Sequence, residues 1–169
     1  MKTENLLQWI EKDSEKIVKL CSTLVQCKTP STTGDTRQAA KVIREFLDEQ
    51  GMEYRELAAC KTMPNIISSV KMNREGRHLM FNGHMDVMPA GKEPGWADDP
   101  WSGAVKDGRI WGRGSSDMKT GVASMLFAYV YLNRVKEDLS GRLSISLVSD
   151  EETGYGREPA FCGNRYRMK

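Results

Sequence analysis

The sequence predicts an α/β fold with three layers, in which helices cover both faces of a mostly parallel central sheet. Segments with helical spacing of apolar residues alternate along the chain with short runs of β-type residues, and this alternation is typical of α/β proteins. The apolar run Leu79–Phe81 is too short to alternate, which indicates a buried central strand. With 169 residues, 39% of them hydrophobic, the chain is long enough for one buried core.

Three amphipathic helices are predicted. Apolar residues recur at helical spacing throughout Glu4–Gln26, which predicts a long first helix. The second begins near Asp35 or Thr36 and ends at Gly51, because glycine favours the position just after a helix. The third runs from Met118 to Val135 and carries its apolar residues on one side.

The strands are predicted between these helices. Asp107-Gly108 is a tight-turn dipeptide between two short apolar runs, so it predicts a β-hairpin over 104–111. The remaining β-type segments are Glu53–Leu57, Asn65–Val70, Leu79–Phe81 and Arg142–Ser149. An acidic triplet follows the last of them directly, which places carboxylates at the end of a strand.

Composition excludes several classes of function. The chain carries 25 Lys and Arg against 23 Asp and Glu, so its net charge gives no reason to expect a nucleic-acid partner. No apolar run is long enough to cross a bilayer, and the N-terminus lacks the apolar core of a signal peptide. The four cysteines form no CxxC pair, which disfavours a thiolate zinc site and a disulfide framework. We therefore expect a cytoplasmic protein with no nucleic-acid or membrane partner.

Polar residues at strand ends are the first candidates for a site, because ligands of open α/β sheets bind beyond the carboxyl ends of the strands. His84 and Asp86 follow the predicted strand Leu79–Phe81, and in an extended segment they project to the same face. The carboxylate can then reach the imidazole, or both can approach one ion. A lone histidine is more often structural than a ligand, so the pair gains weight only with further ligands.

Asp117 lies directly before the third predicted helix. Taken alone, it is best explained as a helix N-cap, for which aspartate is among the preferred residues. Gly112 and Gly114 suggest a phosphate-binding loop, but the Gly-Lys-Ser/Thr ending of such a loop is missing. We therefore discount nucleotide binding at this loop.

Asp150, Glu151 and Glu152 form an acidic triplet after the strand Arg142–Ser149. A solvated acidic turn explains such a triplet locally. Where adjacent carboxylates converge on a partly buried site, however, one of them must hold a proton unless a cation is present. Together with one imidazole, carboxylates at strand and helix ends form a ligand set suited to zinc, manganese or cobalt. A metal-dependent hydrolase is therefore the leading class of function.

Three ordered motifs resemble those of the M20 metallopeptidases, the family of acetylornithine deacetylase, succinyl-diaminopimelate desuccinylase, aminoacylase and related carboxypeptidases. The matching segments are 83–89 (GHMDVMP), 112–119 (GRGSSDMK) and 149–154 (SDEETG). The likeness extends up to about Gly156 and implies a zinc-exopeptidase-like α/β/α fold that is incomplete here. The segment 95–101 (GWADDPW) looks like a loop of the deacetylase and desuccinylase branch.

The resemblance implies a role for each matched polar residue. His84 would bind one metal ion, Asp117 would bridge two, and Glu152 would bind the other. Asp86 would orient the imidazole of His84, and Glu151 would be the general base that takes a proton from a metal-bridging water. Two divalent ions are expected in the full-length enzyme, with zinc preferred and cobalt or manganese as alternatives.

The resemblance also predicts what the chain lacks. Residues 1–156 would be part of the catalytic domain, without the family's later acidic and histidine ligands and without its lid and dimerisation domain. Residues 157–169 do not look like the family's continuation and are interpreted as an atypical tail that arises from a truncation or a frame shift. An ordinary divergent end is the alternative. We expect the chain alone to be inactive and to bind metal weakly.

The function expected of the parent protein is metal-dependent hydrolysis of an amide bond in N-acyl amino acids, of the deacetylase or desuccinylase kind. The expected partner is thus a small-molecule N-acyl amino acid or dipeptide, and a dipeptidase or carboxypeptidase of the same family is an alternative. A second alternative is a non-catalytic fragment that keeps the scaffold. Such a fragment would form homo-oligomers through apolar surface that the missing part would cover.

Overall fold

The structure is a computed structural model that describes residues 3–58, 60–91 and 95–153. Its main elements in chain order are α1 (Thr3–Lys12), α2 (Ser14–Gln26), α3 (Arg37–Glu49), β1 (Arg55–Leu57), β2 (Asn65–Lys71), β3 (Arg74–His84), β4 (Ala104–Lys106), β5 (Arg109–Trp111), α4 (Thr120–Arg134) and β6 (Ser140–Val148). None of the helices in these ranges is long and apolar enough to cross a bilayer. The boundary predicted at 156 and the tail 157–169 lie outside the described residues.

The central sheet has four strands in the order β1-β2-β6-β3, and it is mixed. Only β3 and β6 pair in parallel, whereas β1–β2 and β2–β6 are antiparallel. The α/β class is confirmed, but the prediction of a mostly parallel sheet was wrong for the described strands. Parallel neighbours need a long crossover connection, and the segment that contains α4 provides one between β3 and β6. A short loop joins β1 to β2, which favours antiparallel pairing.

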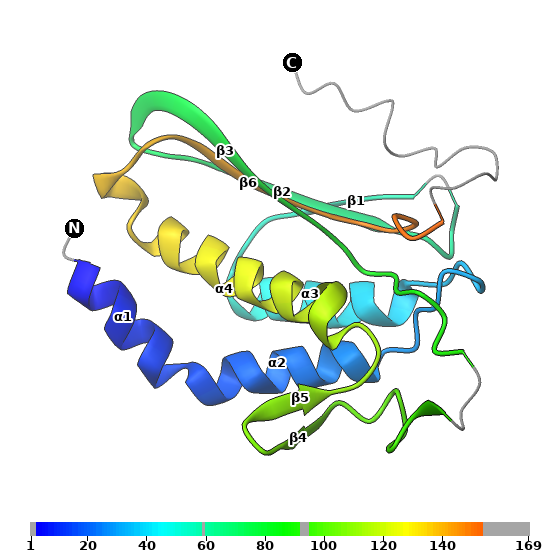
Figure 1. The fold of residues 1–169 in the computed structure, drawn as a ribbon. Helices are drawn as coiled ribbons and strands as arrows, with labels where there is room; N and C mark the ends of the chain where they lie inside the picture. Colours follow the sequence, from blue (N-terminus) through cyan, green and yellow to red (C-terminus); the bar gives the residue numbers. More distant parts are fainter. Residues whose placement is uncertain (1–2, 59, 92–94, 154–169) are drawn as a thin grey trace.

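The helices lie on one face of this sheet, as Figure 1 shows. α4 packs against β3 and β6 on one side and against α2 on the other. α3 lies beside α4, and the rings of Phe46 and Phe127 meet with centroids 5.0 Å apart. The second helical layer of the predicted three-layer fold is therefore not found within residues 3–153 as far as they are described.

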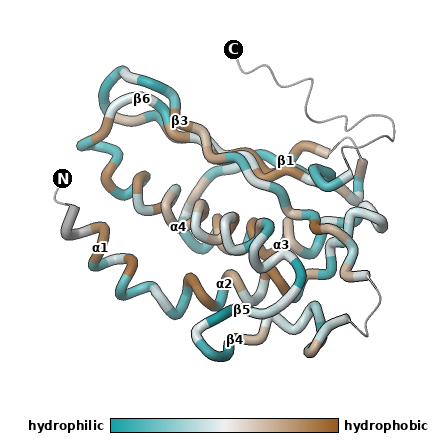
Figure 2. Tube along the Cα trace, viewed as in Figure 1, coloured by the Kyte–Doolittle hydropathy of each residue, from teal (hydrophilic) through white to brown (hydrophobic). Residues whose placement is uncertain are grey.

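Apolar side chains from the sheet and the helices meet in one core. Leu126 and Tyr129 on α4 and Ile145 and Leu147 on β6 are fully buried. The Tyr129 hydroxyl lies 2.8 Å from Ser68 Oγ, so these two polar groups inside the core are paired with each other. Figure 2 shows hydrophilic residues at the loop between β2 and β3 and at the β4–β5 turn, away from the core.

The predicted hairpin is confirmed, and the first predicted helix is broken. Asp107 and Gly108 both have positive φ, 53° and 68°, as the turn between β4 and β5 requires. Asp13 separates α1 from α2, and its buried carboxylate accepts hydrogen bonds from Lys16 Nζ at 2.8 Å and Tyr131 Oη at 3.1 Å. Helical periodicity continues across the break, which is why the sequence predicts one helix.

We expect Leu147→Ala to destabilise the fold by about 2–5 kcal/mol, because it leaves a cavity beside the helical layer. Leu147 is 0% exposed on β6, whereas Leu79 is 52% exposed on β3, which is an edge strand of the described sheet and not the buried central strand that the sequence predicted. The matched control Leu79→Ala should therefore cost about 1 kcal/mol or less. Urea unfolding of both variants checks this expectation, and equal losses would contradict the assignment of the core.

Candidate metal centre

The predicted ligands lie together at the carboxyl end of the parallel pair β3–β6. His84 ends β3 in register with Val148, the last residue of β6. Asp117 comes from the turn before α4, and its Oδ1 lies 3.1 Å from His84 Nε2. Candidate ligand atoms of His84, Asp117 and Glu152 all lie within 4.8 Å of one another. The topology thus brings side chains from three distant segments of the sequence close together.

The hydrogen bonds of His84 determine which ring nitrogen faces the cluster. Nδ1 lies 2.9 Å from the main-chain carbonyl oxygen of Asp86, which can only accept, so Nδ1 carries the proton and donates it. In the neutral ring, Nε2 is therefore an unprotonated acceptor. It faces Asp117 Oδ1 at 3.1 Å and Glu151 Oε2 at 3.7 Å. A second proton on the ring, or a cation between Nε2 and the carboxylates, would make these contacts attractive.

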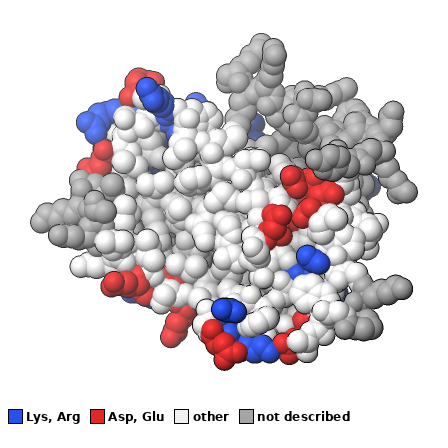
Figure 3. Space-filling model, viewed as in Figure 1, with Lys and Arg blue, Asp and Glu red and all other residues white. Residues whose placement is uncertain are grey.

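The charge of the cluster also favours a cation. Burial raises the pKa of Glu152, and the nearby carboxylates of Asp117 and Asp86 raise it further. Burial likewise raises the pKa of Asp150, with Asp86 as the second cause. Figure 3 shows acidic side chains gathered at the end of the molecule where β6 terminates. One imidazole and two carboxylates are a donor set that fits a divalent ion such as zinc.

Asp86 holds the centre together in a different way from the one expected. Its side-chain oxygen Oδ1 is 3.6 Å from His84 Nδ1, too far for a hydrogen bond, and its main-chain carbonyl takes that role. The buried carboxylate instead accepts the main-chain N–H groups of Glu151 at 3.2 Å and Glu152 at 3.0 Å. Asp86 therefore joins the end of β3 to the acidic turn after β6.

Asp117 is not a helix N-cap, contrary to the local interpretation. α4 begins at Thr120 with Lys119 at the N-cap position, two residues later than predicted. Asp117 has φ −128° and ψ 104°, outside the helical region, and the Asp117–Met118 peptide bond is cis. Its carboxylate is 75% exposed and turned toward His84, which leaves it accessible to an ion.

Sequence reasoning missed the residues that support the centre. Lys119 is 1% exposed, and its Nζ donates to the carbonyl oxygen of Cys27 at 2.6 Å. Burial lowers the pKa of Lys119 to about 8, although the charge of nearby Asp86 opposes this shift. Thr29 is fully buried and donates to the Met85 carbonyl at 2.7 Å. Lys119 could have been noticed because it lies in the family-like segment 112–119, whereas nothing in the sequence singles out Thr29.

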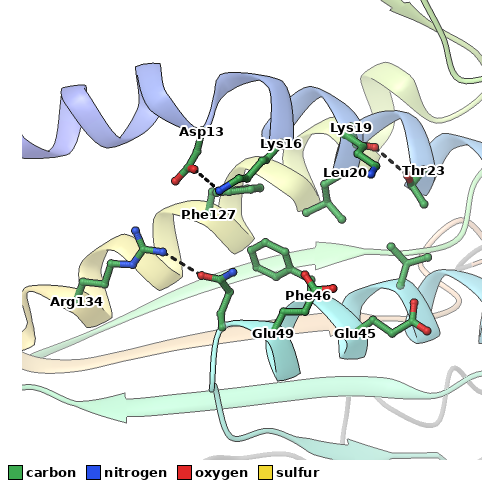
Figure 4. A pocket seen from close by; sticks show the side chains of 12 residues that line it. Asp13, Lys16, Lys19, Leu20, Thr23, Glu45, Phe46, Glu49, Phe127 and Arg134 are labelled. Carbon is green, nitrogen blue, oxygen red and sulfur yellow. Dashed lines mark hydrogen bonds and ion pairs between the residues drawn. The ribbon is translucent and has the colours of Figure 1, made fainter.

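A separate cavity of about 370 Å³ lies between α2, α3 and α4. Figure 4 shows charged residues such as Lys16 and Glu45 around the rings of Phe46 and Phe127. Lys16 is already paired with Asp13, and none of the candidate metal ligands lines this cavity. It is therefore distinct from the metal centre.

Comparison with known proteins identifies the family. The model of peptidase family M20/M25/M40 matches residues 80–168, which is more than half of the chain. The chain belongs to this family. The match includes all three segments that carry the candidate ligands.

Two curated relatives of the M20 chain have N-acyl hydrolase names. Succinyl-diaminopimelate desuccinylase 2 of Ruegeria sp. is 36% identical over 138 residues, which are 81% of this chain and 34% of the relative. N-formyl-4-amino-5-aminomethyl-2-methylpyrimidine deformylase of Halalkalibacterium halodurans is 32% identical over 166 residues, or 96% of this chain and 39% of the relative. The chain thus spans between a third and two fifths of the length of these relatives.

Solved structures share the fold of this chain. Human carnosine dipeptidase 1 superposes with a TM-score of 0.70 at 22% identity, over 89% of this chain and 35% of that protein. A Bacillus subtilis protein described as a dinuclear metal-binding peptidase from the M20 family has a TM-score of 0.54 at 18% identity, over 81% and 35% of the two chains. At these identities the likeness concerns the fold alone.

We expect Asp86→Asn to loosen the acidic turn, because the amide group turns one of its two acceptor atoms into a donor. Hydrogen exchange of the Glu151 and Glu152 amide protons, followed by NMR, should accelerate about 10–100-fold, as loss of a bond to a charged acceptor implies. Asp35→Asn is the control, since Asp35 accepts a main-chain N–H at an exposed site near α3. Unchanged exchange in Asp86→Asn would contradict the role given to this carboxylate.

Proposed function

We propose that this M20 chain supplies metal ligands and the general base of a hydrolase that cleaves the amide bond of N-acyl amino acids. One observation carries the proposal. His84 turns Nε2 toward the carboxylates of Asp117 and Glu151 at 3.1 and 3.7 Å, an arrangement that suits a bound cation. His84 and Asp117 would hold one cation, and Asp117 and Glu152 would hold a second, because the donor atoms of the three residues lie within 4.8 Å of one another.

The full centre would contain two divalent ions, with zinc preferred and cobalt or manganese as alternatives. Asp117 would bridge the two ions, and the dinuclear description of the Bacillus subtilis family member supports this number. Such ions would supply polarisation of the scissile carbonyl and of the attacking water. Three ligands are too few for two ions, so residues 1–156 would form only part of a catalytic domain. This chain alone would then be inactive and bind zinc with a dissociation constant above about 1 μM.

Glu151 is the best-placed general base of the acidic turn. Its carboxylate lies at the edge of the ligand cluster and is 59% exposed, so an incoming substrate can reach it. Its main-chain N–H is fixed by Asp86, which limits the positions its side chain can take. Glu151 would take a proton from the attacking water and pass it to the leaving amine. Asp86 would act on this step only by positioning.

The proposed substrate class follows from the chemistry that the relatives' names describe. A desuccinylase and a deformylase both remove an acyl group from a nitrogen atom. The common requirement is a polarised amide carbonyl and a proton for the departing amine, and the metal-loaded centre with Glu151 would supply both. We propose an N-acyl amino acid as substrate, with a dipeptide as the alternative within the family.

A chimera tests the proposed function. This chain replaces the aligned segment of the Ruegeria desuccinylase, and hydrolysis of N-succinyl-diaminopimelate is measured together with zinc content. We expect an active chimera in which Glu151→Gln lowers kcat about 100-fold or more at unchanged zinc content, because general bases contribute at least this factor. Glu152→Gln should lower the zinc content itself. A folded, zinc-loaded chimera without activity, or full activity of Glu151→Gln, would overturn the proposal.

A further inference from the structure

Lys119 occupies an unusual position for a lysine. Among the Lys and Arg residues of the described ranges, it alone is buried, and its side chain is among the largest that are fully enclosed. Its ammonium group donates to the carbonyl oxygen of Cys27, which follows the last residue of α2, at 2.6 Å. Burying a charged group costs free energy unless the group is paired and hydrogen-bonded. The contact joins the turn that bears Asp117 to a segment more than 90 residues away in sequence.

The segment after α2 is bonded in turn to the segment that follows His84. Thr29 Oγ1 donates to the carbonyl of Met85 at 2.7 Å, and the Val87 amide donates to the Thr29 carbonyl at 3.0 Å. The Met85 amide donates to Val148 on β6 at 2.8 Å. Met85, which lies between His84 and Asp86, is therefore fixed on both its amide and its carbonyl side.

The third segment is the turn 114–119. The Lys119 amide donates to the Gly114 carbonyl at 2.9 Å, which closes the turn around Asp117. A Cβ added at Gly114 would lie 2.5 Å from Val87 Cγ1 and 3.2 Å from Lys119 Cδ. The lysine stem therefore passes between this turn and the segment after His84. Three segments meet around one side chain.

We propose that Lys119 is a positioning residue that fixes Asp117 relative to His84, through its bond to the Cys27 carbonyl and the packing of its stem. This inference rests on the proposed function of the centre as a metal site. Asp117 itself is mostly exposed, and its carboxylate contacts the imidazole of His84. The position of its carboxylate thus depends on the main chain of the turn that Lys119 anchors.

Charge and geometry predict opposite effects when Lys119 is replaced. The ammonium is a cation close to Asp86, so its removal by itself would strengthen the binding of a second cation. If Lys119 positions Asp117, its removal weakens zinc binding instead. Residues that orient the metal ligands without binding the metal typically contribute about 10–100-fold to metal affinity.

The chain offers a direct probe for this test, because it contains only two histidines. Zinc is titrated into the full 169-residue chain, and the imidazole NMR signals are recorded at each step. The zinc concentration at which the His84 signals have shifted halfway is the midpoint for His84. His78 is the internal reference, six residues earlier on β3 and about 20 Å away along the strand. Its Nε2 is paired with Ser144 Oγ at 2.8 Å. Wild-type chain whose His84 signals do not respond to zinc would overturn the metal site itself.

We expect Lys119→Met to weaken the zinc midpoint at His84 about 10-fold or more, whereas Lys41→Met, the same charge change on exposed α3, leaves it unchanged. An unchanged or stronger midpoint in folded Lys119→Met would overturn the role of Lys119 while leaving the metal site intact. If Lys119→Met does not fold, the zinc midpoint at His84 is measured in Thr29→Val instead, with Thr23→Val on α2 as the control. Thr29→Val should weaken zinc binding in the same direction, and a wild-type midpoint would contradict the proposal.

Discussion

The centre depends on Asp86, which connects the end of β3 to the acidic turn after β6, where Glu151 lies 65 residues further along the chain. Its carbonyl oxygen fixes the Nδ1–H of His84, and its buried carboxylate holds the amides of Glu151 and Glu152. The same residue therefore sets the tautomer of the imidazole and the course of the acidic turn. Parallel pairing of β3 with β6 makes this possible, because it brings their carboxyl ends together.

The electrostatics of the cluster follow from this arrangement. Nε2 is left as an acceptor among carboxylates, and burial with like charges raises the pKa of Glu152. Without a metal ion, one of these groups would have to take up a proton. A divalent ion would instead interact favourably with the imidazole and the carboxylates together. Groups with perturbed pKa values and locally unfavourable charge arrangements are common at functional sites. The donor set and the family membership both support the proposed metal-assisted hydrolysis.

The candidate ligands could be singled out from the sequence, because each motif is local and follows a strand or precedes a helix, and the structure brings His84, Asp117 and Glu152 together. The order of the strands could not, since periodicity records burial within an element and says nothing about which strands pair; β6 lies between β2 and β3 without any local signal. The same limit applies to Thr29 and Lys119. Their contacts with the carbonyls of Met85 and Cys27 arise from the tertiary fold.

Anomalous diffraction at the zinc edge, from crystals of this chain grown with zinc, tests the central claim most directly. The account predicts a peak about 2.0–2.2 Å from His84 Nε2, with a carboxylate oxygen of Asp117 at a similar distance. A map without a peak at His84, or with zinc bound only at another position, would contradict it.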